Sequence, residues 1–202
     1  EAYPEAEGRV IEELKALGKP FLILLNSAHP QGEAAQKLRA KLAEQYDVTC
    51  LAVSCLDLDQ QAVTEIIQAV LYEFPLEELQ LFLPDWVETL PTEHPIRTAL
   101  FQAIRAQAGK LVRIRDVKPA VAAMGQCELV TGASVTGMKL GSGCCQARLE
   151  LPRSLFYDTL SQQTGFALHS DGELLALLER LAVVQAEHQK VARSEEHTSE
   201  LQ

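Results

Sequence analysis

The sequence lacks long hydrophobic runs and any excess of basic charge. No stretch of its 202 residues approaches the roughly 20 consecutive apolar residues that span a bilayer, and the opening residues, EAYPEAEGRV, are neither basic nor signal-like. Lys and Arg number 18 against 28 Asp and Glu, which gives a net charge of −10. Sequence-independent binding of nucleic acid needs a basic surface that displaces counterions. We therefore expect a cytoplasmic protein with no transmembrane segment and no nucleic-acid partner.

The sequence also lacks the spacings of a metal site. Its five cysteines form no C-x-x-C pair and have no histidine at ligand spacing, and its five histidines are equally scattered. We expect free thiols in a reducing compartment and no metal bound by these side chains. The cysteines are Cys50, Cys55, Cys127, Cys144 and Cys145.

What is present is an ordinary globular composition, with 47% apolar and 23% charged residues. Helical and strand patterns alternate over the first part of the chain. The patterns predict helices over 10–17, 35–46 and 60–71, and strands over 21–25 and 49–53. Gly18 is placed to end the first helix, and Asp59 to cap the third. This alternation is typical of a parallel α/β sheet. Because both strands are continuously apolar, we expect interior strands with helices on both faces.

The rhythm changes after Phe74-Pro75. The later patterns predict a strand over 79–83, helices over 96–104 and 111–121, a hairpin of 128–135 with 144–151, a helix over 152–163 and a final Leu-rich helix. Pro119 is expected to bend or restart the second of these helices, and Ser170 with Glu173 forms an S-x-x-E capping box for the last. The fold class is therefore α/β, with residues 1–83 in the parallel sheet and 84–192 in a smaller α+β domain.

Two further patterns favour structural roles. The basic residues Lys110, Arg113, Arg115 and Lys118 have near-helical spacing, which predicts a solvated helix face. The glycines of TGASVTGMKLGSG could suggest a phosphate loop, but no GK[ST] ending follows. Turns of a hairpin are the favoured interpretation.

The segment FLILLNSAHP, residues 21–30, carries the candidate binding site. The loops 26–32 and 54–58 both leave the carboxyl ends of strands, where ligands of parallel sheets bind. A G domain places Asn-Lys-x-Asp after such a strand, and its Asp accepts hydrogen bonds from guanine N1–H and the 2-amino group. Asn26 keeps the first position, whereas Ser27 and His29 replace the Lys and the Asp.

The replacement of Asp by His29 changes the expected base preference. His29 cannot offer a carboxylate to the two guanine donors, and adenine has neither of them, so we expect ATP use or a loss of base specificity. Ser54 and Cys55 occupy the later loop that supplies a backbone N–H to the base. The alternative is that Asn26 only caps a turn and His29-Pro30 is an ordinary loop.

The ends of the sequence predict a fragment. Position 1 is not Met, and the last ten residues, RSEEHTSELQ, equal the in-frame translation of a common sequencing-library adapter. We therefore expect residues 193–202 to be an adapter-derived tail and the native chain to continue past residue 192. The alternative is a genuine polar C-terminal tail.

Several segments together resemble the bacterial stage IV sporulation protein A family. They are EAEGRVIEELKALGKPFLILLNSAHP, LYEFPL, LPDWVETL with HPIR, and ELVTGASVTGMKLGSG. The resemblance implies a fold similar to translation-factor-type P-loop GTPases, with residues 1–83 as the C-terminal part of the ATPase domain and 84–192 as part of a middle domain. It also implies that Asn26, Ser27 and His29 match a degenerate base-recognition motif, with Ser54 and Cys55 in the following loop.

The resemblance further implies an ATP-hydrolysing protein that polymerises into the basement layer of the spore coat. Its expected cofactors are ATP and Mg²⁺. The expected partners are further copies of itself, other coat proteins and a small amphipathic membrane-anchoring protein at the forespore surface in the mother cell. Because the family's phosphate loop and Mg²⁺ ligands precede this region, we expect the fragment alone to be inactive and to contain no catalytic residue. The alternatives are a non-catalytic self-associating scaffold and an unrelated α/β enzyme.

Overall fold

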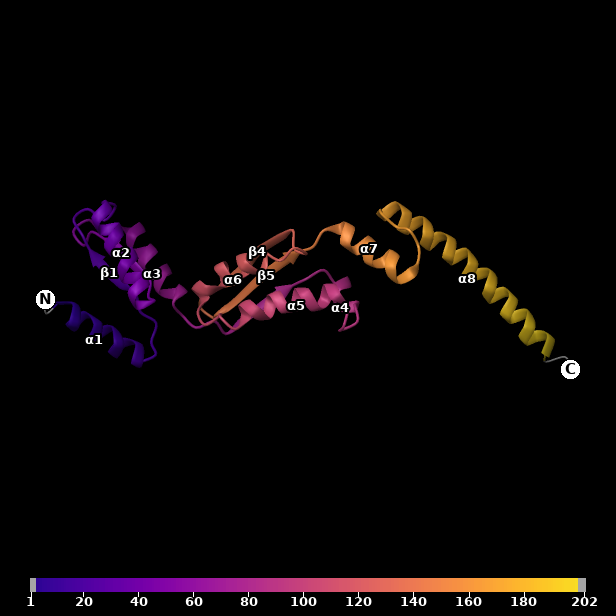
Figure 1. Cartoon of the computed structure of the whole chain (residues 1–202), viewed down its shortest axis with the longest axis horizontal. Helices are drawn as coiled ribbons and strands as arrows, with labels where there is room; N and C mark the ends of the chain where they lie inside the picture. Colours follow the sequence, from indigo (N-terminus) through magenta and orange to yellow (C-terminus); the bar gives the residue numbers. More distant parts are fainter. Residues whose placement is uncertain (1–2, 200–202) are drawn as a thin grey trace. The chain divides into compact units, whose positions relative to one another are not determined.

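The computed structural model describes residues 3–199, and side chains over residues 6–189. The chain folds as two compact units, Glu1–Glu150 and Leu151–Gln202, and Figure 1 labels their α-helices and three of their strands. Within the described residues, every helix is too short or too polar to span a bilayer.

The first sheet of the larger unit confirms the predicted alternation. The elements run α1 (Tyr3–Ala16), β1 (Ile23–Asn26), α2 (Glu33–Tyr46), β2 (Cys50–Val53) and α3 (Gln60–Tyr72). Strands β1 and β2 are parallel, from Ile23 opposite Cys50 to Asn26 opposite Val53. Gly18 follows α1 with a φ of 64°, which only glycine adopts freely. The Asp59 carboxylate accepts the Ala62 N–H at 2.7 Å and so caps α3 as predicted.

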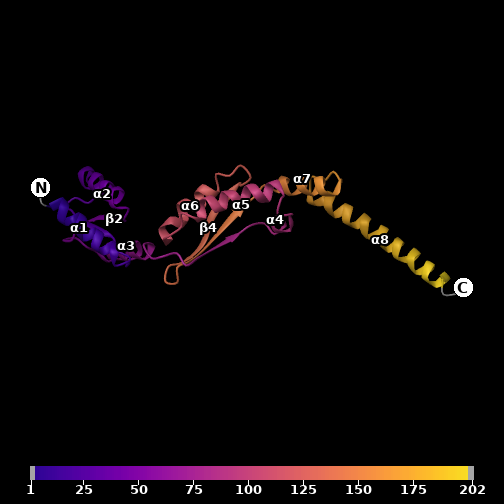
Figure 2. The same ribbon diagram turned by 60° about the horizontal axis from the view of Figure 1, so that its bottom comes forward.

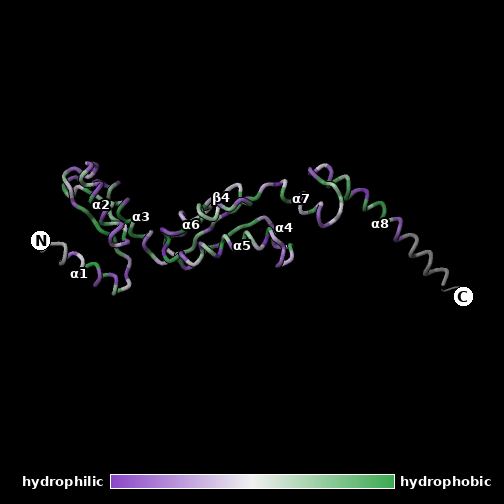
Figure 3. The backbone as a smooth tube through the Cα atoms, viewed as in Figure 1, coloured by the Kyte–Doolittle hydropathy of each residue, from purple (hydrophilic) through white to green (hydrophobic). Residues whose placement is uncertain are grey.

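The prediction that these strands are interior and covered on both faces is wrong for this chain. Among the described residues the sheet contains two strands, so each has a free edge. Exposure alternates along β1, and the Leu24 side chain is 46% exposed. Strand β1 is green in Figure 3 because its first three residues are apolar. An apolar run therefore predicts a strand, but it does not predict how deeply the strand is buried, because burial depends on the elements that pack against it.

The second sheet has three strands and a buried face. Strand β5 (Cys144–Glu150) lies between β3 (Glu78–Phe82), to which it is parallel, and β4 (Gly132–Lys139), to which it is antiparallel. Helices α4 (Trp86–Thr89), α5 (Pro95–Ala108) and α6 (Val117–Met124) and the 3-10 helix η1 (Ile114–Asp116) connect β3 to β4. Figure 2 shows α5 and α6 along one side of the strands. The core contains Ile114, Val117, Val121, Cys145 and Ala147, each at most 1% exposed.

Several predicted bounds of this sheet shift. The helix predicted over 111–121 begins as η1 at Ile114 and continues as α6, and Pro119 lies in the first turn of α6, where its missing N–H breaks no helical bond. The hairpin is confirmed, but its first strand starts at Gly132 instead of Glu128. Gly143 has a φ of 66° in the turn before β5, so the turn interpretation of this glycine holds.

The smaller unit contains α7 (Arg153–Thr164) and α8 (Asp171–Ser199). The Ser170 hydroxyl accepts the Glu173 N–H at 3.3 Å as predicted, while the Glu173 carboxylate accepts the His169 N–H instead of that of Ser170. Hydrogen bonds from Tyr157 and Arg153 lower the pKa of Asp171. The backbone of residues 193–199 continues α8, and the rest of the predicted tail, 200–202, lies outside the described residues.

Candidate functional site

The candidate site lies where β1 and β2 end. The side-chain oxygen of Asn26, the last residue of β1, accepts the N–H of Cys55 at 3.1 Å. The Ser27 N–H donates to the Val53 carbonyl at 2.9 Å and continues the ladder by one residue. Asn26 therefore joins two loops that are 29 residues apart in the sequence, and it does more than cap its own turn. The Cys55 N–H is already used in this bond.

The other predicted residues stabilise the two loops locally. The Ser27 hydroxyl accepts the His29 N–H at 3.2 Å, and the Ser54 hydroxyl donates to the Asp57 carboxylate at 2.9 Å. The Gln36 side chain of α2 donates to the Pro30 carbonyl at 2.7 Å. His29 is exposed. The structure therefore brings the loops of all five predicted residues to one edge of the sheet.

A pocket of about 390 Å³ adjoins these loops. Its walls include Ala28 and Pro30 from the first loop, Ser54 and Asp57 from the second, and Ala62 from the first turn of α3. Of the five predicted site residues, all of which the structure describes, Ser54 lines this pocket and the other four do not. Residues of both loops, of β2 and of α3 therefore line one pocket at the carboxyl edge of the sheet.

Metal ligands do not gather at this edge. Among the described residues, no group of three or more His, Cys, Asp or Glu side chains could hold a metal ion.

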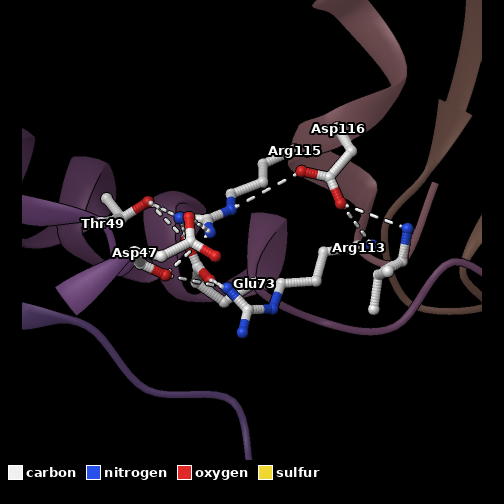
Figure 4. A network of polar contacts seen from close by, with 7 residues as sticks. Asp47, Thr49, Glu73, Arg113, Arg115 and Asp116 are labelled. Carbon is white, nitrogen blue, oxygen red and sulfur yellow. Dashed lines mark hydrogen bonds and ion pairs between the residues drawn. The ribbon is translucent and has the colours of Figure 1, made fainter. Parts of the chain in front are cut away.

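A second polar site, which the sequence did not predict, lies at the opposite ends of β2 and α3. The Glu73 carboxylate, 2% exposed, binds Arg113 and Arg115 at 3.1 Å each. Its Oε1 also accepts the Thr49 hydroxyl, and Arg115 reaches the Asp47 carboxylate at 2.8 Å. Figure 4 shows the two guanidinium groups converging on these acids. We call Asp47, Thr49, Glu73, Arg113 and Arg115 the arginine clamp.

The backbone around the clamp is also ordered. Asp47 has a φ of 49° at the end of α2, and its carbonyl accepts Arg115 at 2.9 Å and Arg113 at 3.3 Å. The Asp116 carboxylate accepts the Arg113 N–H at 2.8 Å. The Ile114 N–H donates to the Phe74 carbonyl at 3.0 Å, so the segment before α6 pairs with the segment after α3.

The clamp overturns the prediction of a solvated basic helix face. Arg113 and Arg115 precede α6, and their side chains are 30% and 23% exposed because they bind a buried carboxylate. Lys118 lies 5.6 Å from the centre of the Tyr72 ring of α3. The signal that could have revealed the clamp is Glu73 itself, an acid set between apolar residues in LYEFPL.

A helix–strand unit whose strand-end loops meet beside a pocket defines an α/β domain of the kind that binds ligands at its carboxyl edge. The family models agree with this class. Residues 1–75 match the model described as "Stage IV sporulation protein A, ATPase domain", and residues 76–201 match "Stage IV sporulation protein A, middle domain". The chain belongs to the stage IV sporulation protein A family.

Three curated relatives carry the same family name. The chain is 34% identical over 190 residues to the stage IV sporulation protein A of Clostridioides difficile (strain 630). It is 33% identical to those of Bacillus subtilis (strain 168) and Bacillus anthracis. Each alignment covers 94% of this chain but 39% of the relative. No solved structure matches the chain significantly.

The family models and the strand pairing give different views of the predicted domain boundary at residue 84. The two models meet between residues 75 and 76. Strand β3, which precedes the predicted boundary at residue 84, pairs with β5, which follows it. The assignment of 193–202 as an adapter-derived tail stays a prediction.

Proposed function

We propose that this chain is part of an ATP-hydrolysing morphogenetic protein that self-assembles into the basement layer of the bacterial spore coat. The observation that carries the proposal is the Asn26–Cys55 bond, which joins the two loops at the carboxyl edge of a sheet in the ATPase-domain region. The pocket beside these loops is large enough to receive a nucleobase.

The base preference in this proposal follows from His29. An acid at this position would accept both guanine donors, and His29 has no carboxylate to offer. Adenine loses nothing at such a site, so ATP is favoured over GTP. The phosphates and Mg²⁺ would be held by groups outside this chain, so the chain alone would be inactive.

The proposed setting is the mother cell, at the outer forespore membrane. The proposed partners are further copies of the protein, other coat proteins and a small amphipathic anchoring protein. These assignments rest on the family to which the chain belongs. The second candidate is a non-catalytic self-associating scaffold, in which the bonds of Asn26, Ser27 and Ser54 to neighbouring loop atoms serve only to stabilise the two loops.

The test compares ATP and GTP in the complete protein with His29→Asp. Wild type is expected to bind and hydrolyse ATP in preference to GTP. The new carboxylate should raise the relative affinity for GTP by roughly tenfold or more, because it supplies the partner that guanine requires. Both affinities are measured by titration calorimetry, and hydrolysis by phosphate release.

The matched control is His188→Asp, which makes the same charge change on exposed surface of α8. It should leave the ATP/GTP ratio unchanged. An unchanged ratio in His29→Asp would remove the base-site assignment, whereas wild-type protein that binds no nucleotide but still assembles would establish the scaffold.

A further inference from the structure

The arginine clamp and the candidate nucleotide site lie at opposite ends of the same two elements. Strand β2 begins just after Asp47 and Thr49 of the clamp and ends just before Ser54 of the pocket. Helix α3 begins just after Asp59, beside the pocket, and ends just before Glu73. The clamp residues Arg113 and Arg115 come from the middle-domain match, and Glu73 comes from the ATPase-domain match.

From this placement we infer that the arginine clamp couples the nucleotide loops to the middle domain. Binding that fixes the carboxyl ends of β2 and the start of α3 also fixes Thr49 and Glu73 at the other ends of these elements. Because Arg113 and Arg115 bind Glu73, a fixed Glu73 also restricts the motion of the segment 111–118. The inference rests on the proposed function for the identity of the ligand, but the clamp itself rests on contacts alone.

The burial of Glu73 is the physical reason for a stiff connection. A carboxylate that is 2% exposed must keep its partners, because an unpaired buried charge is costly. Here both oxygens are engaged, Oε1 by Thr49 and Arg115 and Oε2 by Arg113. The partners come from the turn before β2 and from the segment before α6, so neither segment can shift without breaking bonds to the same carboxylate.

The packing around the clamp supports the same connection. Tyr72, the last residue of α3, packs against the core built on Ile114, Val117 and Cys145. The Leu76 N–H donates to the Val112 carbonyl at 3.0 Å. The end of α3, a helix of the ATPase-domain match, therefore packs against the core of the second sheet.

The experiment is hydrogen–deuterium exchange on the complete protein, as wild type and with Glu73→Gln, with and without Mg·ATP. Glu73→Gln keeps the shape of the side chain and removes its charge. Without nucleotide, the variant should exchange at least about fivefold faster at both 47–52 and 111–118, because the clamp orders both segments. Faster exchange in one of these segments only would overturn the clamp as a connection.

The nucleotide arm tests the coupling. In wild type, Mg·ATP should slow exchange in the loops 26–32 and 54–58 and also in 111–124. In the variant, protection of the loops should remain and protection of 111–124 should be lost. Equal protection of 111–124 in both proteins, or loop protection alone in wild type, would overturn the coupling and leave the nucleotide site intact.

If Mg·ATP does not protect the loops of the wild type, nucleotide binding at this edge is contradicted, and so is the coupling. The exchange rates measured without nucleotide still test the clamp. Arg115→Lys, which keeps the charge but loses the double contact with Glu73 and Asp47, gives a second variant if Glu73→Gln fails to fold. The control is Arg153→Lys in the exposed pair with Asp171, which should change neither segment.

Discussion

The two sheets of the larger unit differ in how fully they are covered. Strand β5 of the second sheet is central, and Leu149 on it is 1% exposed. Strand β1 of the first sheet has a free edge, and Leu24 on it is 46% exposed. Both strands are rich in apolar residues, so the difference comes from neighbours and not from composition. Each sheet has a core, around Ala147 in the second and around Val48 in the first, but the first leaves one side of β1 in contact with water.

The largest effect is expected from a matched pair of leucines. Leu149→Ala should lower the free energy of unfolding by about 4 kcal/mol, because it leaves a cavity in a closed core. Leu24→Ala should lower it by less than about 1 kcal/mol, because nearly half of that side chain is already in water. Urea unfolding of each variant gives both values. Equal losses of unfolding free energy would contradict the difference in coverage between the two sheets. A larger loss for Leu24→Ala in the complete protein than in this chain would show that other elements cover β1 there.

A smaller effect is expected at two helix N-caps. The Asp59 carboxylate accepts the Ala62 N–H, whereas Asp85, the N-cap of α4, makes no side-chain capping bond. Asp59→Ala should cost about 1 kcal/mol of stability, and Asp85→Ala should cost less than about 0.5 kcal/mol since no capping bond is lost. Thermal unfolding measures both, and Asp59→Asn should recover most of the loss. A similar cost at both sites would contradict the assignment of the cap.

The smallest effect concerns one buried thiol in each sheet. Burial raises the pKa of Cys50 on β2 and of Cys145 on β5 above the ordinary 9.0. Each thiol stays neutral when folded, so its contribution to stability is present below pH 9 and declines as the pH rises through the folded pKa. At pH 8, iodoacetamide should modify Cys50 faster than Cys145, because the open sheet exposes its strands at lower cost. Mass spectrometry after timed labelling checks the order, with exposed Cys55 as the fast reference. Faster modification of Cys145 than of Cys50 would contradict the more open structure of the first sheet.

Much of the fold follows from local pattern. Apolar periodicity located the helices and strands, and Asp59 and Gly18 marked helix ends by their own chemistry. The position of Asn26 at the end of a strand predicted that it lies at the carboxyl edge of the sheet, and the structure places it there. These features depend on residues that are close in sequence or on the general geometry of parallel sheets.

The arginine clamp could not be predicted in the same way. Its bonds join residues from 24 positions apart, as between Thr49 and Glu73, to 68 positions apart, as between Arg115 and Asp47. The near-helical spacing of Lys110, Arg113, Arg115 and Lys118 predicted a solvated helix face. Arg113 instead precedes the 3-10 helix η1, Arg115 lies in it, and both bind Glu73. Long-range pairing of charges depends on tertiary contacts that periodicity does not contain.

The position of β3 in its sheet sets an order of events during synthesis. Gln80 on β3 bonds to Gln146 on β5, which is 66 residues later. Until the ribosome has added those residues, β3 has no partner strand. Glu73 likewise has no ion-pair partner until Arg113 and Arg115 have been added. The nascent chain therefore carries an unpaired acid until residues 113–115 have emerged and an unpaired strand until β5 has emerged, and an unpaired strand edge is prone to misassociation.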